Sequence, residues 1–343
     1  MPRRENMDKT QKKWFYLSLA FSMAILVFIL ASTFNEDTLQ YLTHINIWFL
    51  LIAIGLRFVS FSLWAARIKV MAASLCYQVK YSHCYNMVVA NLLIGAITPG
   101  QAGGEPVRIH ELYKADMSLG DATAVVIMER VLDAVILVAL TVFSLLVMGK
   151  VIWDMGEGIV FVIFFSLAVL ILFVVVLFFA ARKPESAKDK VMRLLHWIEA
   201  KMKTPGIHRI IASTDVEFDN FCSGITAFTS HGKKGIIQGA VFSVLFWFSE
   251  FIVASVILMG LGLPPSISES MLSQIIIALI SMIPLTPGAS GIAEISATSL
   301  YALFVPTAVL GVFIILWRLI MFYLNIVFGV IATVLIFKRE ISA

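Results

Sequence analysis

Long apolar runs constrain this chain more than any other feature of its sequence. A helix needs about 20 apolar residues to cross the hydrocarbon core of a bilayer. Six runs have about that length or more, and the last is long enough to span with tilt: residues 14–31, 47–66, 122–149, 159–181, 236–261 and 306–337. Only 14% of the residues are charged, against about 25% in a soluble domain. This composition excludes a soluble enzyme, a disordered chain and a nucleic-acid-binding domain, and it predicts an all-α integral membrane protein.

The distribution of Lys and Arg predicts the orientation of these spans. Cytoplasmic loops of membrane proteins carry an excess of basic residues. The segment 1–13 carries five, the segment 182–234 carries ten, and the segment 32–46 carries none. Further basic residues expected on the same side are Arg67, Lys69, Lys80, Lys338 and Arg339. We therefore expect a multi-pass protein of the cell membrane with both termini in the cytoplasm.

Two further apolar stretches, residues 87–97 and 271–285, each run into the sequence Thr-Pro-Gly-x-x-Gly. Proline lacks a backbone donor and glycine permits positive φ, so both residues interrupt a helix. The pattern predicts two broken, re-entrant helical segments, although full spans remain an alternative. The first motif comprises Thr98, Pro99, Gly100, Gly103 and the adjacent Gly104, and the second comprises Thr286, Pro287, Gly288 and Gly291.

Charged residues repeat together with the two motifs. Glu105 follows the first motif and Glu294 the second. Arg130 follows Thr98 at the same spacing at which Arg318 follows Thr286. The expected orientation makes the two copies run in opposite directions through the membrane. Inverted repeats with broken helices are typical of secondary transporters, whose substrate site lies near the midplane at the repeat interface. The competing interpretation is two proline-kinked spans and a coincidental hexapeptide.

These features predict one polytopic domain, residues 1–343, built from two inverted-topology repeats. The first half covers residues 14–181 and the second covers residues 235–337. The polar segment 182–234 between them has apolar residues at helical spacing, and we expect a cytoplasmic amphipathic connector on the membrane surface, with a solvated helix as the alternative.

From Asn91 to Asp133 the sequence follows the pattern N…TPGxxGGExxR…ER..D, and the second copy reads TPGxxGxxE before Arg318. This pattern resembles the lysylphosphatidylglycerol synthase transmembrane-region family, also called flippase-like or UPF0104 proteins, over nearly the whole chain. The resemblance implies a membrane domain that moves lipids or lipid-linked groups between leaflets. Bifunctional members carry an aminoacyl-transferase domain after the membrane part. The sequence ends at Ala343 without one, so we expect no lysyl transfer.

Ionisable residues inside spans are costly and usually functional. Glu129 and Asp133 share a helix face at i,i+4 spacing, with Arg130 beside them. Our hypothesis is that Arg130 and Arg318 hold a lipid phosphate, since the guanidinium fork bonds two oxygens at once. Candidate headgroup-binding residues are Arg130, Arg318, Glu129, Asp133, Glu105, Arg108 and Glu294. The alternative is that Arg130 pairs with Asp133 or Glu105 and only holds the fold.

Glu250 lies among aromatic residues in the run 236–261, where it could couple transport to protons or pair with Arg57, pairing being favoured. Glu105 suits the positive end of a short helix, as a cap or as a functional group. The six histidines have no metal-ligand spacing and no P-loop is present, so we expect no metal, no other cofactor and no ATPase activity.

The expected partners are membrane lipids, in particular an anionic phospholipid or a polyprenyl-phosphate-linked cargo. A homodimer stays open, and no nucleic acid is expected. A small-solute secondary transporter is the second interpretation, and a lipid transferase or its accessory subunit is the third. A lipid would need a groove open sideways to the bilayer, whereas a solute would need a closed central cavity.

Overall fold

The computed structural model describes residues 27–28, 31–33, 36–96, 98, 103–154, 156–182, 193, 219–226, 228, 233–281, 286 and 288–341. Most of the expected first span and of the amphipathic connector lies outside these residues, as do Pro99, Gly100 and Pro287. Within the described residues every regular element is a helix, which confirms the all-α prediction there. The helices are α2 (Glu36–Thr43), α3 (Ile47–Ser74), α4 (Tyr81–Ala96), α5 (Gly104–Lys114), α6 (Leu119–Asp154), α7 (Glu157–Arg182), α10 (Lys233–Gly260), α11 (Ile267–Ser281), α12 (Ile292–Tyr301), α13 (Thr307–Arg318), a π-helical turn (Leu319–Tyr323) and α14 (Leu324–Ile341).

Four stretches of the described chain are long and apolar enough to cross a membrane. They are Ile47–Ser74, Leu119–Val147, Lys233–Gly260 and Thr307–Ile336. Helix α7 coincides with the expected run 159–181. One expectation is wrong: α3 does not stop near residue 66 but continues to Ser74, so Arg67 and Lys69 lie within the helix and not in the loop after it.

Helices α3 and α10 form the centre of the molecule and pack along their whole length in antiparallel directions. Close approach is possible because small residues lie at the contact. The hydroxyls of Ser60 and Ser249 are 2.7 Å apart at the crossing. Near one end Gly235 faces Ser74, and near the other Gly260 faces Phe49 and Leu50.

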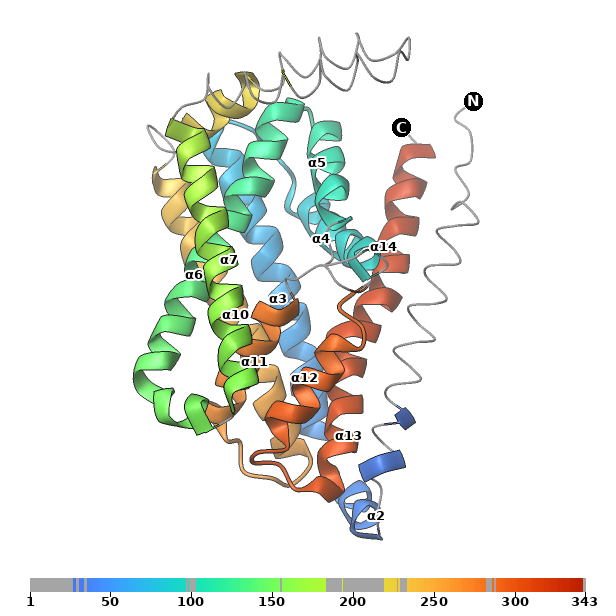
Figure 1. Ribbon diagram of the computed structural model, residues 1–343. Coiled ribbons are helices and arrows are strands. Elements are labelled where there is room, and N and C mark those ends of the chain that lie inside the picture. Colours follow the sequence, from blue (N-terminus) through green and yellow to red (C-terminus); the bar gives the residue numbers. More distant parts are fainter. Residues whose placement is uncertain are drawn as a thin grey trace.

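Two pairs of short helices are inserted against this centre from opposite ends (Figure 1). Helices α4 and α5 occupy the upper part of the view, and α11 and α12 occupy the lower part. None of the four is among the candidate spans. Helix α4 packs against α5 and α11 packs against α12, so each pair forms a hairpin of two short helices.

The tips of the two hairpins meet inside the molecule. The backbone N–H of Gly288 donates to the carbonyl oxygen of Thr98 over 3.1 Å. Gly288 has a φ of 56°, and a Cβ built on it would lie 2.6 Å from the carbonyl oxygen of Ala96. Glycine is needed here because a side chain would meet both the left-handed backbone strain and this close contact.

Candidate functional site

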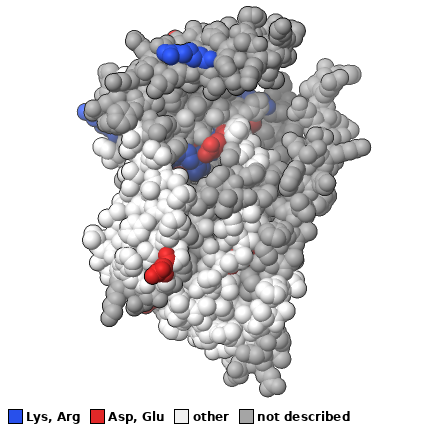
Figure 2. Space-filling model, in the orientation of Figure 1, with Lys and Arg blue, Asp and Glu red and all other residues white. Residues whose placement is uncertain are grey.

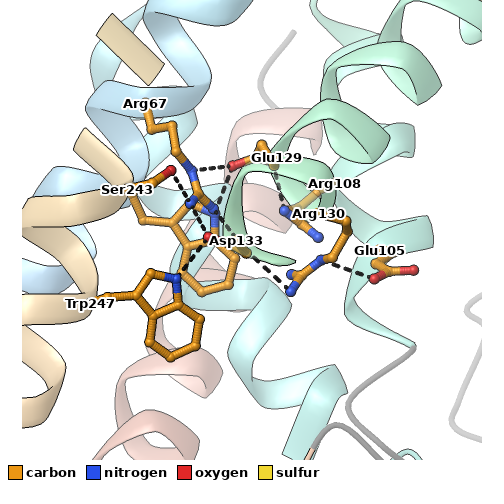
Figure 3. A network of polar contacts seen from close by, with 9 residues as sticks. Arg67, Glu105, Arg108, Glu129, Arg130, Asp133, Ser243 and Trp247 are labelled. Carbon is orange, nitrogen blue, oxygen red and sulfur yellow. Dashed lines mark hydrogen bonds and ion pairs between the residues drawn. The ribbon is translucent and has the colours of Figure 1, made fainter. Parts of the chain in front are cut away.

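Arg67 of α3 is fully buried and binds two carboxylates of α6 (Figure 3). Its Nε donates to Glu129 Oε1 over 2.9 Å, and its Nη1 donates to Asp133 Oδ1 over 2.6 Å. The same Nη1 donates to Ser243 Oγ of α10 over 2.9 Å. Since Glu129 and Asp133 are one helical turn apart, both can face a single guanidinium. This arginine joins three helices.

Glu129 accepts hydrogen bonds from two further buried donors. Arg108 Nη1 of α5 donates to its Oε2 over 2.6 Å, and Trp64 Nε1 of α3 donates to its Oε1 over 3.0 Å. Glu129, Arg67 and Arg108 all have 0% exposure. A buried carboxylate surrounded by donors of this kind is compensated for its loss of hydration. Glu129 therefore fixes α5 against α3 and α6.

Arg130 lies on the accessible side of the same helix. Its Nε is 3.1 Å from Glu105 Oε1, and its Nη1 is 3.7 Å from Asp133 Oδ2. The Arg130 side chain is 28% exposed and that of Glu105 is 40% exposed. Glu105 lies in the first turn of α5, but its carboxylate points to Arg130. The N-cap residue of α5, Gly103, has no side chain that could cap the helix. Both pairings considered for Arg130 are present together.

The second hairpin carries a corresponding pair that is almost completely buried. Arg318 Nε, at the end of α13, donates to Glu294 Oε1 of α12 over 2.8 Å. The other oxygen of Glu294 accepts the backbone N–H of Gly291 over 2.7 Å, so this carboxylate also caps α12. The Arg318 guanidinium lies over the ring of Phe322 at 4.2 Å. The π-helical turn begins directly after Arg318.

A further ion pair connects the two central helices. Arg57 Nη1 of α3 contacts Glu250 Oε1 of α10, and Arg57 Nε donates to Asn325 Oδ1 of α14 over 3.1 Å. This is the pairing expected for Glu250. Through these two partners Arg57 links α3 to both α10 and α14.

These charged groups surround a cavity of about 240 Å³ beside the hairpin tips. Its wall comes from both hairpins and from α3, α6 and α10. The end of α13, the π-helical turn and the start of α14 complete it. The charged residues lining it are Arg57, Arg67, Glu105, Arg130, Asp133, Glu250 and Arg318. Figure 2 shows acidic and basic atoms together in a recess on the side of the molecule, and the other described residues on this face are mainly uncharged.

The predicted residues fall into three groups around this cavity. Those at its wall are Arg57, Glu105, Arg130, Asp133, Glu250, Gly288 and Arg318. Those buried behind the wall, which hold the lining residues in place, are Arg108, Glu129 and Glu294. Those that shape the hairpin tips are Thr98, Gly103, Gly104, Thr286 and Gly291; Thr98 Oγ1, for example, accepts the N–H of Gly103 over 2.9 Å.

Several lining residues are not predicted from the sequence. The basic-residue pattern places Arg67 after the second apolar run, on the cytoplasmic side. The sequence does not distinguish a basic residue in a cytoplasmic loop from one within the last two turns of a longer helix. The polar side chains of Asn91, Gln274 and Asn325 and the indoles of Trp64, Trp247 and Trp317 also line the cavity. A single polar residue in an apolar helix is the only local signal that such positions offer.

Similarity to known proteins covers nearly the whole chain. Residues 15–329 match the family model described as Lysylphosphatidylglycerol synthase TM region. A UPF0104 membrane protein of Archaeoglobus fulgidus is 35% identical over 318 residues, which are 92% of this chain and 95% of that protein. A UPF0104 membrane protein of Methanothermobacter thermautotrophicus is 26% identical over 279 residues, 79% of each chain. No solved structure shows a significant match.

Proposed function

Since the chain belongs to the lysylphosphatidylglycerol synthase TM region family, we propose that it is a lipid translocase. In this proposal a phosphate-bearing headgroup passes through the charged cavity while the acyl chains stay in the bilayer. The chain acts as a transporter in the cell membrane with cytoplasmic termini, and not as an enzyme. The observation that carries the proposal is the meeting of two broken hairpins, from opposite ends, beside a cavity lined by arginines and carboxylates.

We further propose that the chain consists of two inverted repeats. The order α3, α4, α5, α6 recurs as α10, α11, α12, α13. The starts of α3 and α4 recur at one common offset, from 47 to 233 and from 81 to 267. The starts of α5 and α6 recur at a second, slightly larger one, from 104 to 292 and from 119 to 307. The corresponding hairpins enter from opposite ends in Figure 1. Such repeats supply two similar halves that can rock against each other around one site.

The repeated ion pairs support this assignment. Glu105 lies 3.1 Å from Arg130, and Glu294 lies 2.8 Å from Arg318, so the glutamate after each motif pairs with the arginine of its own half. Each arginine follows the start of its helix, position 119 or 307, at the same spacing. At 1.5 Å per residue both lie about 16 Å along their helices, from opposite ends. The two pairs therefore approach the same level in the membrane.

The size and chemistry of the cavity suit a headgroup better than a whole lipid. A volume of about 240 Å³ is below the usual range for drug-sized ligands, roughly 300–1,000 Å³. Guanidinium groups replace the hydration of phosphate by bidentate hydrogen bonds. The carboxylates offset the charge of these arginines and orient them when no cargo is bound. Without such partners, groups this deep in the membrane would cost several kcal/mol each.

The recess on the side of the molecule favours a lipid over a small solute. Glu105 and Arg130 are the most exposed of the charged side chains in the cavity wall, whereas Arg318 and Arg57 are nearly buried. An opening through the side of the helices lets a headgroup enter while its chains remain in hydrocarbon. The cargo class in this proposal is an anionic phospholipid or a polyprenyl-phosphate-linked group.

Leaflet accessibility in proteoliposomes tests the proposal. The purified protein is reconstituted with fluorescent phosphatidylglycerol, lysyl-phosphatidylglycerol or a polyprenyl phosphate, and dye reduction from outside reports the fraction of each lipid in the outer leaflet. We expect faster exchange of at least one lipid than in liposomes with heat-inactivated protein. If folded protein accelerates none of the three, the solute-transporter interpretation replaces this one.

A further inference from the structure

We propose that the cavity contains an asymmetric phosphate subsite on the wall of the second half, formed by the Trp317 indole N–H and the Arg318 guanidinium. Naming the anion as a lipid phosphate rests on the proposed function, whereas the subsite itself rests on geometry. In this proposal Trp317 selects for cargo that carries a phosphate, although the residue is uncharged and lies outside the repeated motif.

Three tryptophans line the cavity, and two of their indoles have acceptors. Trp64 Nε1 donates to Glu129 over 3.0 Å, and Trp247 Nε1 donates to Asp133 over 3.1 Å. Trp317 Nε1 is buried and has no hydrogen-bond partner among the described residues. The residue is only 4% exposed, so bulk water does not serve its donor. A buried unpaired donor costs about 1–3 kcal/mol, which an acceptor in the cavity would recover.

Arg318 supplies a second unused donor, and its guanidinium carbon lies 5.9 Å from the centroid of the Trp317 ring. Its Nε is fixed by Glu294, and its Nη2 is buried without a partner within the described part of the chain. The side chain is 5% exposed and lies over the Phe322 ring. Both residues line the cavity. An acceptor with several oxygens and a negative charge can satisfy a guanidinium edge and an indole N–H together, and phosphate has this chemistry.

The first half offers a different environment at the corresponding place. Arg130 Nη1 lies 3.7 Å from Asp133 and its Nε lies 3.1 Å from Glu105, so two carboxylates already offset its charge. Thr98 Oγ1 donates to the carbonyl of Ile94 and accepts from Gly103, whereas the corresponding Thr286 Oγ1 is buried without a partner in the described structure. Arg130 Nε likewise has no hydrogen-bond partner among the described residues, but it is paired with Glu105, and the wall there carries two carboxylates. The wall of the second half instead offers the unused donors Trp317 Nε1 and Arg318 Nη2, so an anion is favoured there.

Trp317→Phe tests the subsite because it removes the N–H and keeps an aromatic ring. The apparent Kd of the full-length protein in detergent is measured for dihexanoyl-phosphatidylglycerol, for dihexanoylglycerol and for inorganic phosphate. We expect Trp317→Phe to weaken binding of the phospholipid about tenfold relative to dihexanoylglycerol. The matched variant Trp247→Phe removes an indole that already has an acceptor, so it should change binding of both lipids by the same factor.

If Trp317→Phe and Trp247→Phe change the ratio of phospholipid affinity to dihexanoylglycerol affinity equally, the subsite is overturned. Weakened binding of inorganic phosphate by Trp317→Phe, with unchanged phospholipid binding, would support an anion subsite at Trp317 but overturn its assignment to a lipid phosphate. Indole ¹⁵N–¹H spectra keep the test independent of folding in the variants: the Trp317 signal of the unmutated protein should shift on adding the phospholipid and not on adding dihexanoylglycerol. If Trp317 responds but no lipid crosses the bilayer, the subsite stands and the translocase proposal fails.

Discussion

Neutralising Glu129 should destabilise the protein far more than neutralising Glu105, which pairs with an arginine on the accessible side of the cavity. Glu129→Gln keeps the shape of the side chain and removes its charge. Arg67 would keep Asp133, but Arg108 would lose the one carboxylate to which it donates among the described residues, and a glutamine leaves it only a neutral acceptor. An arginine with 0% exposure would then be buried without a counter-charge.

The magnitude follows from the burial of the group. Removing one partner of a buried ion pair costs about 3–5 kcal/mol, whereas an exposed pair contributes roughly 0–1 kcal/mol. A chain of this size shifts its Tm by about 2 °C per kcal/mol, so we expect a loss of about 6–10 °C. Glu105→Gln is the matched control, since Glu105 also pairs with an arginine but its side chain is 40% exposed. It should lower the Tm by about 2 °C or less.

Heating the detergent-purified variants and measuring the fraction that remains monodisperse gives the two Tm values. In the double variant Glu129→Gln/Arg108→Met, removal of the orphaned charge should recover part of the loss. Equal, small shifts for Glu129→Gln and Glu105→Gln would refute the reasoning, because burial would then not decide the strength of these pairs.

The remaining predictions concern packing and coupling. Gly288→Ala should lower both Tm and transport, because its Cβ would lie 2.6 Å from a carbonyl of the opposite hairpin at a positive φ, and a thermal scan with a transport assay measures both. Gly235→Ala should destabilise by about 1 kcal/mol or more because its Cβ would overlap Ser74, whereas Gly55→Ala has nothing within 4 Å and should be neutral or slightly stabilising. Transport by wild type should not respond to a proton gradient, since Glu250 is held by Arg57; a rate that follows the gradient would contradict this.

Much of the charged site could be predicted from residue spacing. Residues at i,i+4 on a helix must share a face, and Glu129 and Asp133 indeed bind the same arginine. A lone carboxylate in an apolar span needs a counter-charge, which favours Arg57 as the partner of Glu250. These inferences succeed because they depend on helix geometry and on the cost of an unpaired charge.

The other part depends on tertiary packing, which local sequence does not encode. Arg67 has the same sequence environment as a basic residue at a cytoplasmic helix end, and only the approach of α6 and α10 buries it. Glu105 and Glu294 follow equivalent motifs, yet among the described residues only Glu294 accepts a backbone N–H at the start of its own helix, that of Gly291. The π-helical turn after Arg318 likewise has no sequence signal that we recognise.

The initial rate of lipid exchange in proteoliposomes containing Arg318→Ala or Arg130→Ala tests the central claim most directly. Lys80→Ala, which changes an exposed lysine in the loop before α4, is the control. We expect each arginine variant, recovered as folded protein, to lower the rate at least tenfold, while Lys80→Ala keeps the wild-type rate. Wild-type rates in both arginine variants would show that the headgroup does not pass through this cavity.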